Sequence, residues 1–420
     1  MIPTPAPVPD QPKADVMPVL DNLTTLIRKA RGTTEHPTLT GGLINIDALP
    51  QSAKHHNLPV RETSEEEEIR GALFESGLYL ARQDAWATLG EAIRSADVLR
   101  AMTPGGVPEA QILAEGARAD AITAATRAVR GDDEMAAAAI LEEMQLVLKE
   151  VPDDHGIAYV VAMAHVDIGW AWRGEGWRKE IPASHRAAFF RHFKRAGDLI
   201  DGFDAFELDS PMLASVRCTL LSAETRPRAR ASDDYEDLID LAPGTASYMR
   251  ALGNHMLPRW FGSHQRLEHE ARRTMVRTGD VWGAGGYSWT YLDALTVDDD
   301  AFALLDADLF CQGLRDILAR QGDQHTANVL AAYTGSALEP SGVNREARMR
   351  IAECFDWIVT EHLREVHPRV WYAAKGVWAA RLDEADRLAK GRHRAWAALD
   401  RHARGLPPVT MPAQVNRNAG

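Results

Sequence analysis

Hydrophobic residues recur at helical spacing along most of the chain. Phe189, Phe193 and Ala196 follow one another at intervals of three or four residues, and later segments repeat the pattern. A period near 3.6 residues predicts helices that bury one face. Because no segment shows the sustained alternation of a strand, we predict an all-α body over residues 64–405. Prolines separate its periodic segments, as helix boundaries require, at Pro104, Pro152, Pro182, Pro211, Pro243, Pro340 and Pro368.

Local signals indicate where several helices begin. Ser64 followed by Glu67 is a capping box at the start of the body. Aspartate clusters stand where other helices are expected to open, and carboxylates there cap the helix and favour its dipole. We interpret them as caps rather than as acid–base pairs: Asp132–Asp133, Asp153–Asp154, Asp233–Asp234 and Asp298–Asp300. The glycine-rich stretch 283–288 predicts a turn before a helix at Tyr287, since no strand precedes it.

The two ends of the chain differ from the body. Residues 1–63 open with a proline-rich stretch and predict a flexible N-terminal extension. Within it, an apolar stripe from Val16 to Ile27 predicts one short helix. Residues 406–420 predict a disordered tail. The N-terminus has neither a basic nor an apolar segment of the kind that a secretory signal requires.

Charge and cysteine usage narrow the class of protein. The 420 residues include 60 acidic and 47 basic side chains, a formal charge of −13, which argues against a nucleic-acid binder. The three cysteines are isolated from one another, so we expect neither a disulfide framework nor a structural zinc site. No apolar run reaches the ~18 residues of a membrane span. These features are typical of a cytoplasmic protein that binds neither membrane nor nucleic acid.

Two segments can be laid over each other, and each carries a histidine five residues before a tryptophan: His165 with Trp170, and His255 with Trp260. The segment from Gly131 to Pro152 resembles a tetratricopeptide repeat. Gly131 and Asp132 form its turn, Ala136 takes the small packing position, Ile140 the large one, and Pro152 closes the unit. The longer stretch 250–289 is similar to bacterial proteins of unknown function with a tetratricopeptide-like fold.

This resemblance implies a right-handed α-solenoid of stacked antiparallel helix pairs. Because one helix pair cannot bury its apolar face alone, such pairs stack into a curved array with a concave groove. Grooves of this kind hold an extended peptide or a partner helix. The resemblance therefore implies an adaptor or scaffold that binds an unidentified protein or peptide. The alternative is an enzyme or small-molecule binder with a pocket between solenoid lobes, lined by histidine, arginine and tryptophan.

The stretch "HMLPRWFGS" at 255–263 supplies two of the four candidate site residues, His255 and Arg259. Pro258 is expected to end the helix that holds His255. Trp260 and Phe261 are both expected to fold back onto the hydrophobic seam, the apolar contact between the two helices that this stretch joins. The candidate groove residues are His165, Trp170, His255 and Arg259. We find no catalytic motif and no set of metal or cofactor ligands, because the paired histidines point apart or lie too far apart for one ion. We therefore predict no catalytic residue, cofactor or metal.

Overall fold

The computed structural model describes residues 58–174, 180–338, 342–374 and 383–406. Within these ranges the regular structure is helical, and β pairing is limited to two isolated bridges. The prediction of an all-α body is therefore confirmed. Pro340, the short helix expected between Val16 and Ile27, and most of the extension and tail lie outside the described residues.

The first half of the chain forms mostly long helices. They are α2 (Glu65–Arg82), α3 (Trp86–Val98), α4 (Glu109–Arg130), α5 (Glu134–Glu150), α6 (His155–Arg173), α7 (Ala183–Ile200), α8 (Pro211–Leu220), the 3₁₀ turn η3 (Leu221–Ala223) and α9 (Pro227–Leu241).

The second half is broken into shorter helices and turns. They are α10 (Ala246–His255), α11 (His264–Arg277), α12 (Gly279–Trp282), α13 (Gly285–Leu292), α14 (Ala294–Val297), η4 (Asp299–Ala303), α15 (Ala307–Arg320), α16 (Gln324–Ala332), η5 (Tyr333–Ala337), α17 (Arg345–Ala352), α18 (Cys354–Trp357), η6 (Ile358–His362), α19 (Pro368–Ala373) and α20 (Glu384–Ala403). Two of these elements, η5 and η6, are π-helical turns.

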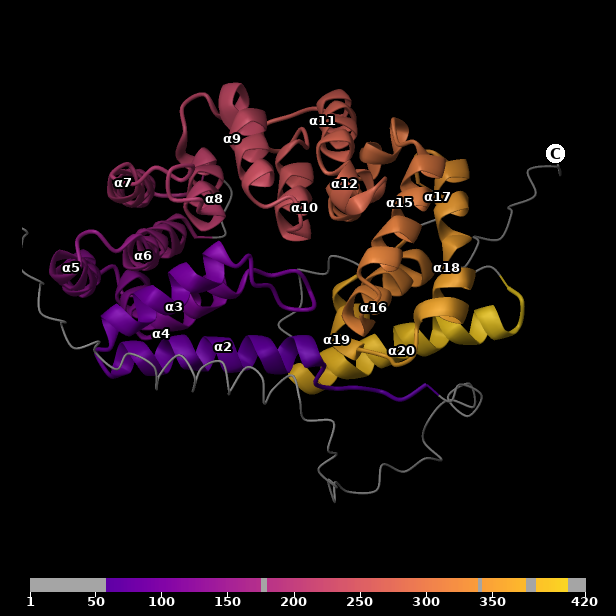
Figure 1. Cartoon of the computed structure of the whole chain (residues 1–420), viewed down its shortest axis with the longest axis horizontal. Coiled ribbons are helices and arrows are strands. Elements are labelled where there is room, and N and C mark those ends of the chain that lie inside the picture. The colour runs from indigo at the N-terminus through magenta and orange to yellow at the C-terminus, as the bar shows by residue number, and fades with distance from the viewer. Residues whose placement is uncertain (1–57, 175–179, 339–341, 375–382, 407–420) are drawn as a thin grey trace, which may run out of the picture.

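The helices follow one another around a ring, and the last ones return to the side of the first (Figure 1). Val60 and Val366 form a parallel bridge where the two ends of the body meet. The Arg61 guanidinium pairs with Glu365 at 3.1 Å. Two further ion pairs join the C-terminal helices to the start of α2, Arg369 with Glu67 and Arg392 with Glu62. The array of helices is thus closed by main-chain and ionic contacts.

The loop 99–108, between α3 and α4, reaches across the inside of the ring. The Ser247 hydroxyl of α10 donates a hydrogen bond to the Gly106 carbonyl at 3.2 Å. The Arg100 guanidinium donates to the Leu241 carbonyl at 3.0 Å, and the Gln321 amide to the Pro104 carbonyl at 2.5 Å. The inner side of the ring is therefore bridged by the chain's own loop, which joins the first helices to α9, α10 and α15.

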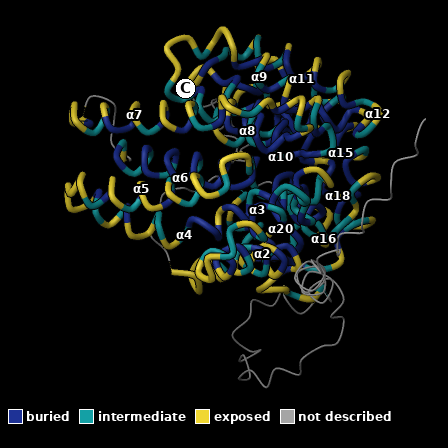
Figure 2. The backbone as a smooth tube through the Cα atoms, turned by 60° about the vertical axis from the view of Figure 1, so that its left-hand side comes forward, coloured by how far each residue is buried: buried dark blue, intermediate teal, exposed yellow. Residues whose placement is uncertain are grey.

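Helix α6 lies at the centre of the N-terminal half. It packs against α3, α4, α5, α7 and α8. Its sequence is apolar on nearly every side, and residues from Gly156 to Trp172 are buried all around the helix. Figure 2 shows this contrast, with buried positions along α6 and exposed ones along α5. A helix that is apolar all round is stable only when covered on all sides, as α6 is.

Two glycines allow α2 and α4 to approach closely. A Cβ on Gly77 would lie 2.0 Å from the Leu113 carbonyl oxygen. A Cβ on Gly116 would lie 2.0 Å from the Phe74 carbonyl oxygen. Each glycine therefore lies directly against the backbone of the other helix, where no other residue would fit without moving the two helices apart.

Most of the predicted caps form. Ser64 and Glu67 make a reciprocal capping box, so this prediction is confirmed. Asp133, Asp154 and Asp298 cap α5, α6 and η4 with their side chains, as expected. Likewise, Gly283 has a φ of 56° in the turn before α13, which begins at Gly285.

The prediction that Asp233–Asp234 opens a helix is wrong. Both residues lie inside α9, which begins earlier, with Pro227 in its first turn. The fixed φ of proline suits that first turn, so the helix starts there rather than at the carboxylates. Asp234 then pairs with Arg230 one turn before it, at 3.4 Å. Its carboxylate supports the helix from within instead of capping it.

Candidate functional site

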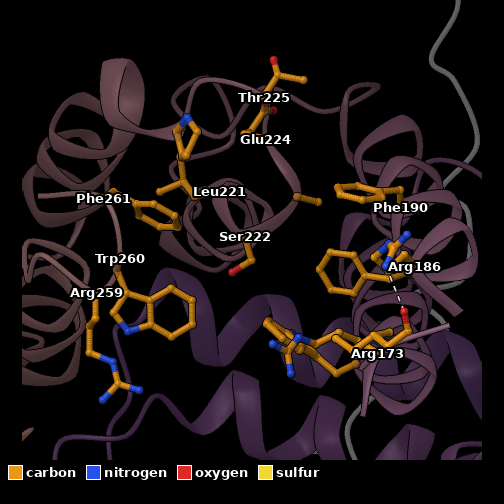
Figure 3. Close-up of a pocket in the computed structure, with 15 residues that line it drawn as sticks. Arg173, Arg186, Phe190, Leu221, Ser222, Glu224, Thr225, Arg259, Trp260 and Phe261 are labelled. Carbon is orange, nitrogen blue, oxygen red and sulfur yellow. Dashed lines mark hydrogen bonds between the residues drawn. The ribbon is translucent and has the colours of Figure 1, made fainter. Parts of the chain in front are cut away.

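An open cleft of about 1030 Å³ lies between α7, the end of α6 and the segment that follows α10. Figure 3 shows Trp260 and Phe261 on one side of this cleft, with Arg173 and Phe190 on the other. Its remaining wall comes from the turn between α8 and α9. The lining residues are Trp170, Arg173, Ile181, Arg186, Phe189, Phe190, Leu221, Ser222, Ala223, Glu224, Thr225, Pro227, Arg259, Trp260 and Phe261.

One side of the cleft is an aromatic cluster built from two neighbouring helices. The Trp170 ring on α6 meets Phe189 and Phe193 on α7 edge to face, with centroids 5.2 Å and 5.8 Å away. Phe189 and Phe193 are buried, whereas Phe190, the next residue after Phe189, is 50% exposed. The buried rings hold Trp170 in place, and the exposed Phe190 ring lines the cleft. Such rings offer a large apolar contact area that needs little further ordering.

The opposite side holds Trp260, and here the sequence prediction is wrong for Trp260, although it is right for Phe261. Trp260 does not fold back onto the seam, because its side chain is 37% exposed and lines the cleft. Phe261, the next residue, is buried and takes the seam position instead. As predicted, α10 ends before Pro258, but the turn that follows directs Phe261 inward. With Phe261 directed inward, the Trp260 ring is left partly exposed in the cleft.

His255 supports this aromatic pair from behind rather than lining the cleft. Its ring lies 5.6 Å from the Trp260 ring and 5.0 Å from the Phe261 ring, between centroids. Its Nδ1 shares a hydrogen bond with the Tyr235 hydroxyl at 2.9 Å. Burial lowers the pKa of His255 to about 4, so the ring is uncharged near neutral pH. The histidine therefore positions Trp260 and adds no charge to the cleft.

Three arginines make the cleft cationic. Arg186 donates to the Ile181 carbonyl at 2.9 Å, and Arg173 donates to the Gly174 carbonyl at 2.7 Å. Both guanidinium groups line the cleft. Arg259 is exposed and has no hydrogen-bond or ion-pair partner among the residues that the structure describes.

A single acidic residue, Glu224, is among the described residues that line the cleft. Its carboxylate pairs with Arg230, which lies outside the lining, at 3.2 Å. The negative charge of Glu224 is therefore already matched by a neighbour. Among the described lining residues, three are arginines and one is acidic, in a protein whose formal net charge is −13.

The fourth candidate residue, His165, lies away from the cleft. It is 4% exposed on α6, and its Nδ1 is 3.0 Å from Nδ1 of His192 on α7. Its Nε2 is 3.0 Å from the Gln145 amide nitrogen. Burial lowers the pKa values of His165 and His192 to about 3 and about 4. The two uncharged rings share one hydrogen bond and form a structural contact between the helices.

Two of the four candidate residues therefore meet at one site. Trp170 and Arg259 line the same cleft, although they are far apart in the sequence. His255 lies behind Trp260 and Phe261, and His165 lies away from the cleft. Sequence reasoning missed Arg173, Arg186 and Phe190. For Phe190 a signal exists, since it is an aromatic residue that falls off the apolar stripe of Phe189 and Phe193. No local pattern distinguishes the two arginines from others on solvated helix faces.

Comparison of the sequence and structure with known protein families, curated proteins and solved structures finds no match. Among the described residues, no three histidine, cysteine, aspartate or glutamate side chains are grouped closely enough to hold a metal ion. Within the same residues, every helix is too short or too polar to cross a membrane.

Proposed function

We propose that the protein binds an acidic peptide segment that carries an aromatic side chain, and that it acts as an adaptor or scaffold. One observation carries the proposal: the exposed ring of Trp260 stands beside the unpartnered guanidinium of Arg259, in a cleft that also holds Arg173 and Arg186. Exposed tryptophan and arginine in a concave site are the residue types that dominate peptide and protein binding.

Charge complementarity defines the chemistry of this partner. A carboxylate that enters the cleft can take a bidentate hydrogen bond from Arg259, because no acidic side chain in the described part of the chain pairs with this guanidinium. An aromatic side chain of the partner can lie between the rings of Trp260 and Phe190, which face the cleft from opposite sides (Figure 3). At about 1030 Å³ the cleft is at the upper end of the ~300–1,000 Å³ range of ligand sites. This volume suits a short peptide segment.

We also propose a tetratricopeptide-like right-handed solenoid as the architecture that carries the site. Consecutive helices are neighbours around the ring (Figure 1). Stacked antiparallel helix pairs would follow one another in the same way in a solenoid whose two ends meet. The loop 99–108 bridges the inner side of this ring. In this proposal the partner therefore binds at the cleft between α6–α7 and α8–α10, and the inner side serves for internal contacts.

Selection of random peptides displayed on phage tests the proposal directly. The full-length protein is the bait, and Arg259→Glu is the bait for counter-selection, since it reverses the charge without removing an aromatic ring. We expect enrichment of peptides that combine aspartate or glutamate with an aromatic residue. A selection that yields basic or purely apolar peptides, or none that Arg259→Glu rejects, contradicts the proposal.

The affinity of an enriched peptide then separates the cleft from the rest of the surface. Fluorescence anisotropy should show that Arg259→Ala weakens binding by tenfold or more, roughly the effect of losing a binding hot spot. The matched control is Arg127→Ala, which removes the same charge from an exposed position on α4. It should change the affinity less than about twofold. Equal losses for the two variants would indicate attraction by the whole surface rather than binding in the cleft.

A further inference from the structure

An open groove of about 390 Å³ lies between the end of α2, α4 and α5. Both α2 and α5 pack against α4, and the groove is formed where these three helices meet. None of its lining residues lines the cleft at Trp260, so the two sites are separate. The lining residues are Leu78, Ala81, Arg82, Asp84, Trp86, Ala117, Asp120, Ala121, Ala124, Ile140, Glu143, Met144 and Val147.

Apolar residues at helical spacing line this groove from two helices. On α4 they are small and lie four and three residues apart, and on α5 they are larger and have the same spacing. They are Ala117, Ala121 and Ala124 on α4, and Ile140, Met144 and Val147 on α5. Ala124 is exposed, and Ala121, Ile140 and Val147 are half-buried, so the described residues leave this apolar surface open. Apolar grooves between helices typically accept the apolar face of an amphipathic helix.

The charged residues of the groove are mostly acidic. Arg82 donates two hydrogen bonds to the Asp120 carboxylate, at 2.7 Å and 2.9 Å, so these two charges offset each other. Asp84 and Glu143 are exposed, and neither carboxylate has a hydrogen-bond or ion-pair partner among the described residues. Two unmatched carboxylates therefore favour an occupant that carries basic residues beside its apolar face.

The chain itself contains a segment with this pattern, at residues 16–31, outside the described part of the chain. Leu20, Leu23 and Ile27 stand at positions i, i+3 and i+7, which is the spacing of the anchors of a helix in a groove. Three basic residues and one acidic residue give the segment a net charge of +2, opposite to the two carboxylates of the groove. They are Arg28, Lys29, Arg31 and Asp21.

The connection between this segment and the body is long enough to reach the groove. The 18 residues of α2 span about 27 Å, and the groove lies at the end of α2 that is distant from Leu58. Residues 32–57 join the segment to Leu58, and a flexible chain of about 26 residues spans roughly 30 Å on average. A segment tethered in this way meets its site at an effective concentration on the order of millimolar.

We propose that residues 16–31 dock as an amphipathic helix in the groove between α2, α4 and α5 of the same molecule. Leu20, Leu23 and Ile27 pack against the apolar lining, and the basic residues at the end of the segment lie beside Asp84 and Glu143. The groove is thus an interaction surface for a segment of the chain's own N-terminal extension.

Photocrosslinking in the full-length protein tests this proposal. p-Benzoylphenylalanine replaces Leu23, and mass spectrometry maps the crosslinked peptides after irradiation. We expect crosslinks to residues 78–86, 117–124 or 140–147. The same group at Thr25 is about 200° further around the helix and should crosslink to these ranges at least fivefold less.

The alternative occupants give different crosslinks. A mixture of ¹⁵N-labelled and unlabelled protein shows whether the two crosslinked segments belong to one chain. Crosslinks that join a labelled to an unlabelled chain would indicate that a second copy fills the groove. Such crosslinks, crosslinks only outside the three ranges, or none at all overturn the proposal.

Substitutions at exposed positions locate the contact without disturbing the core. Ala124→Arg places a long charged side chain in the groove and should lower the crosslinking yield from position 23 at least fivefold, whereas Ala138→Arg, on an exposed part of α5 outside the lining, should not. Glu143→Lys should lower the yield at least twofold, and Glu142→Lys, its exposed neighbour outside the lining, should leave it unchanged. Circular dichroism checks that each variant keeps the wild-type helix content. Equal yields within either pair refute the assignment.

Discussion

Acid should destabilise the protein through the buried pair His165 and His192. The two Nδ1 atoms are 3.0 Å apart across the contact between α6 and α7, and both rings are uncharged in the folded state. Burial is the main cause, and it lowers the pKa values to about 3 and about 4. In the unfolded chain both rings return to an ordinary pKa near 6.5. The unfolded state therefore takes up protons first as the pH falls.

The sign and size of the effect follow from these pKa values. Between pH 6.5 and about 4 the unfolded chain binds more protons than the folded protein, so stability is lost as the pH falls through this window. From pH 7 to pH 5, each histidine lowers the free energy of unfolding by about 2 kcal/mol, and the pair by about 4 kcal/mol. That is a large share of the ~5–15 kcal/mol stability typical of a domain.

Replacing one histidine isolates this contribution. Glutamine in His192→Gln can still hydrogen-bond to His165, but it does not titrate. Urea unfolding at pH 7 and pH 5, followed by far-UV circular dichroism, gives the stability lost between the two values. The loss should be about 2 kcal/mol smaller in His192→Gln than in the wild type. The contributions of all other titrating groups to this loss are the same in both proteins, so they cancel in the difference. His269→Gln, which removes an exposed histidine on α11, should lose as much as the wild type.

One result would refute the reasoning. If the wild type and His192→Gln lose the same stability between pH 7 and pH 5, the His192 ring gains no additional proton on unfolding in that range. The pair would then be accessible to solvent or already protonated, and the close packing of α6 on α7 around it would be incorrect.

Three further predictions follow from burial and close contact. Gly77→Ala should destabilise the protein by about 1–3 kcal/mol or more, because its Cβ would meet the Leu113 carbonyl of α4. Gly71→Ala, on an open face of the same helix, should stabilise it by roughly 0.5–1 kcal/mol in urea unfolding. Asp97 has the opposite pH dependence to the histidines. Burial raises its pKa to about 6, so wild-type stability gains about 1 kcal/mol from this group between pH 7 and pH 5, and Asp97→Asn should abolish the gain. Trp260→Ala should cost less than the ~3–5 kcal/mol of a buried tryptophan, since the ring is 37% exposed, and calorimetry checks this.

The sequence by itself determined the all-α class and those helix boundaries that prolines and N-terminal caps mark. The apolar period around Phe189 and Phe193, the capping box at Ser64 and Glu67, and the proline boundaries depend on residues close together in the chain. Asp233–Asp234 failed as a start because the stronger local signal, Pro227, stands six residues earlier. These features can be deduced from the sequence because helix formation depends on contacts within one or two turns.

Only the tertiary structure decided which residues form sites. Trp170 and Arg259 come to one cleft through the packing of α6–α7 against the segment after α10, and His165 is covered by α7 instead. In the turn after α10, the sequence predicts burial of both Trp260 and Phe261, but only Phe261 is buried and Trp260 is 37% exposed. Both residues are apolar and adjacent, so no pattern of hydrophobicity ranks them.

The surroundings of Arg250 and Tyr333 are the clearest case of a feature that no local pattern predicts. Arg250 pairs with Asp293, and the Tyr333 hydroxyl has no hydrogen-bond partner among the described residues, because segments distant in the sequence pack around them. An ordinary helix surface carries arginine, aspartate and tyrosine as well, and nothing in their spacing distinguishes the two cases. Helices arise from interactions between near neighbours, whereas a site arises from the long-range packing that decides which polar groups remain unpaired in the interior.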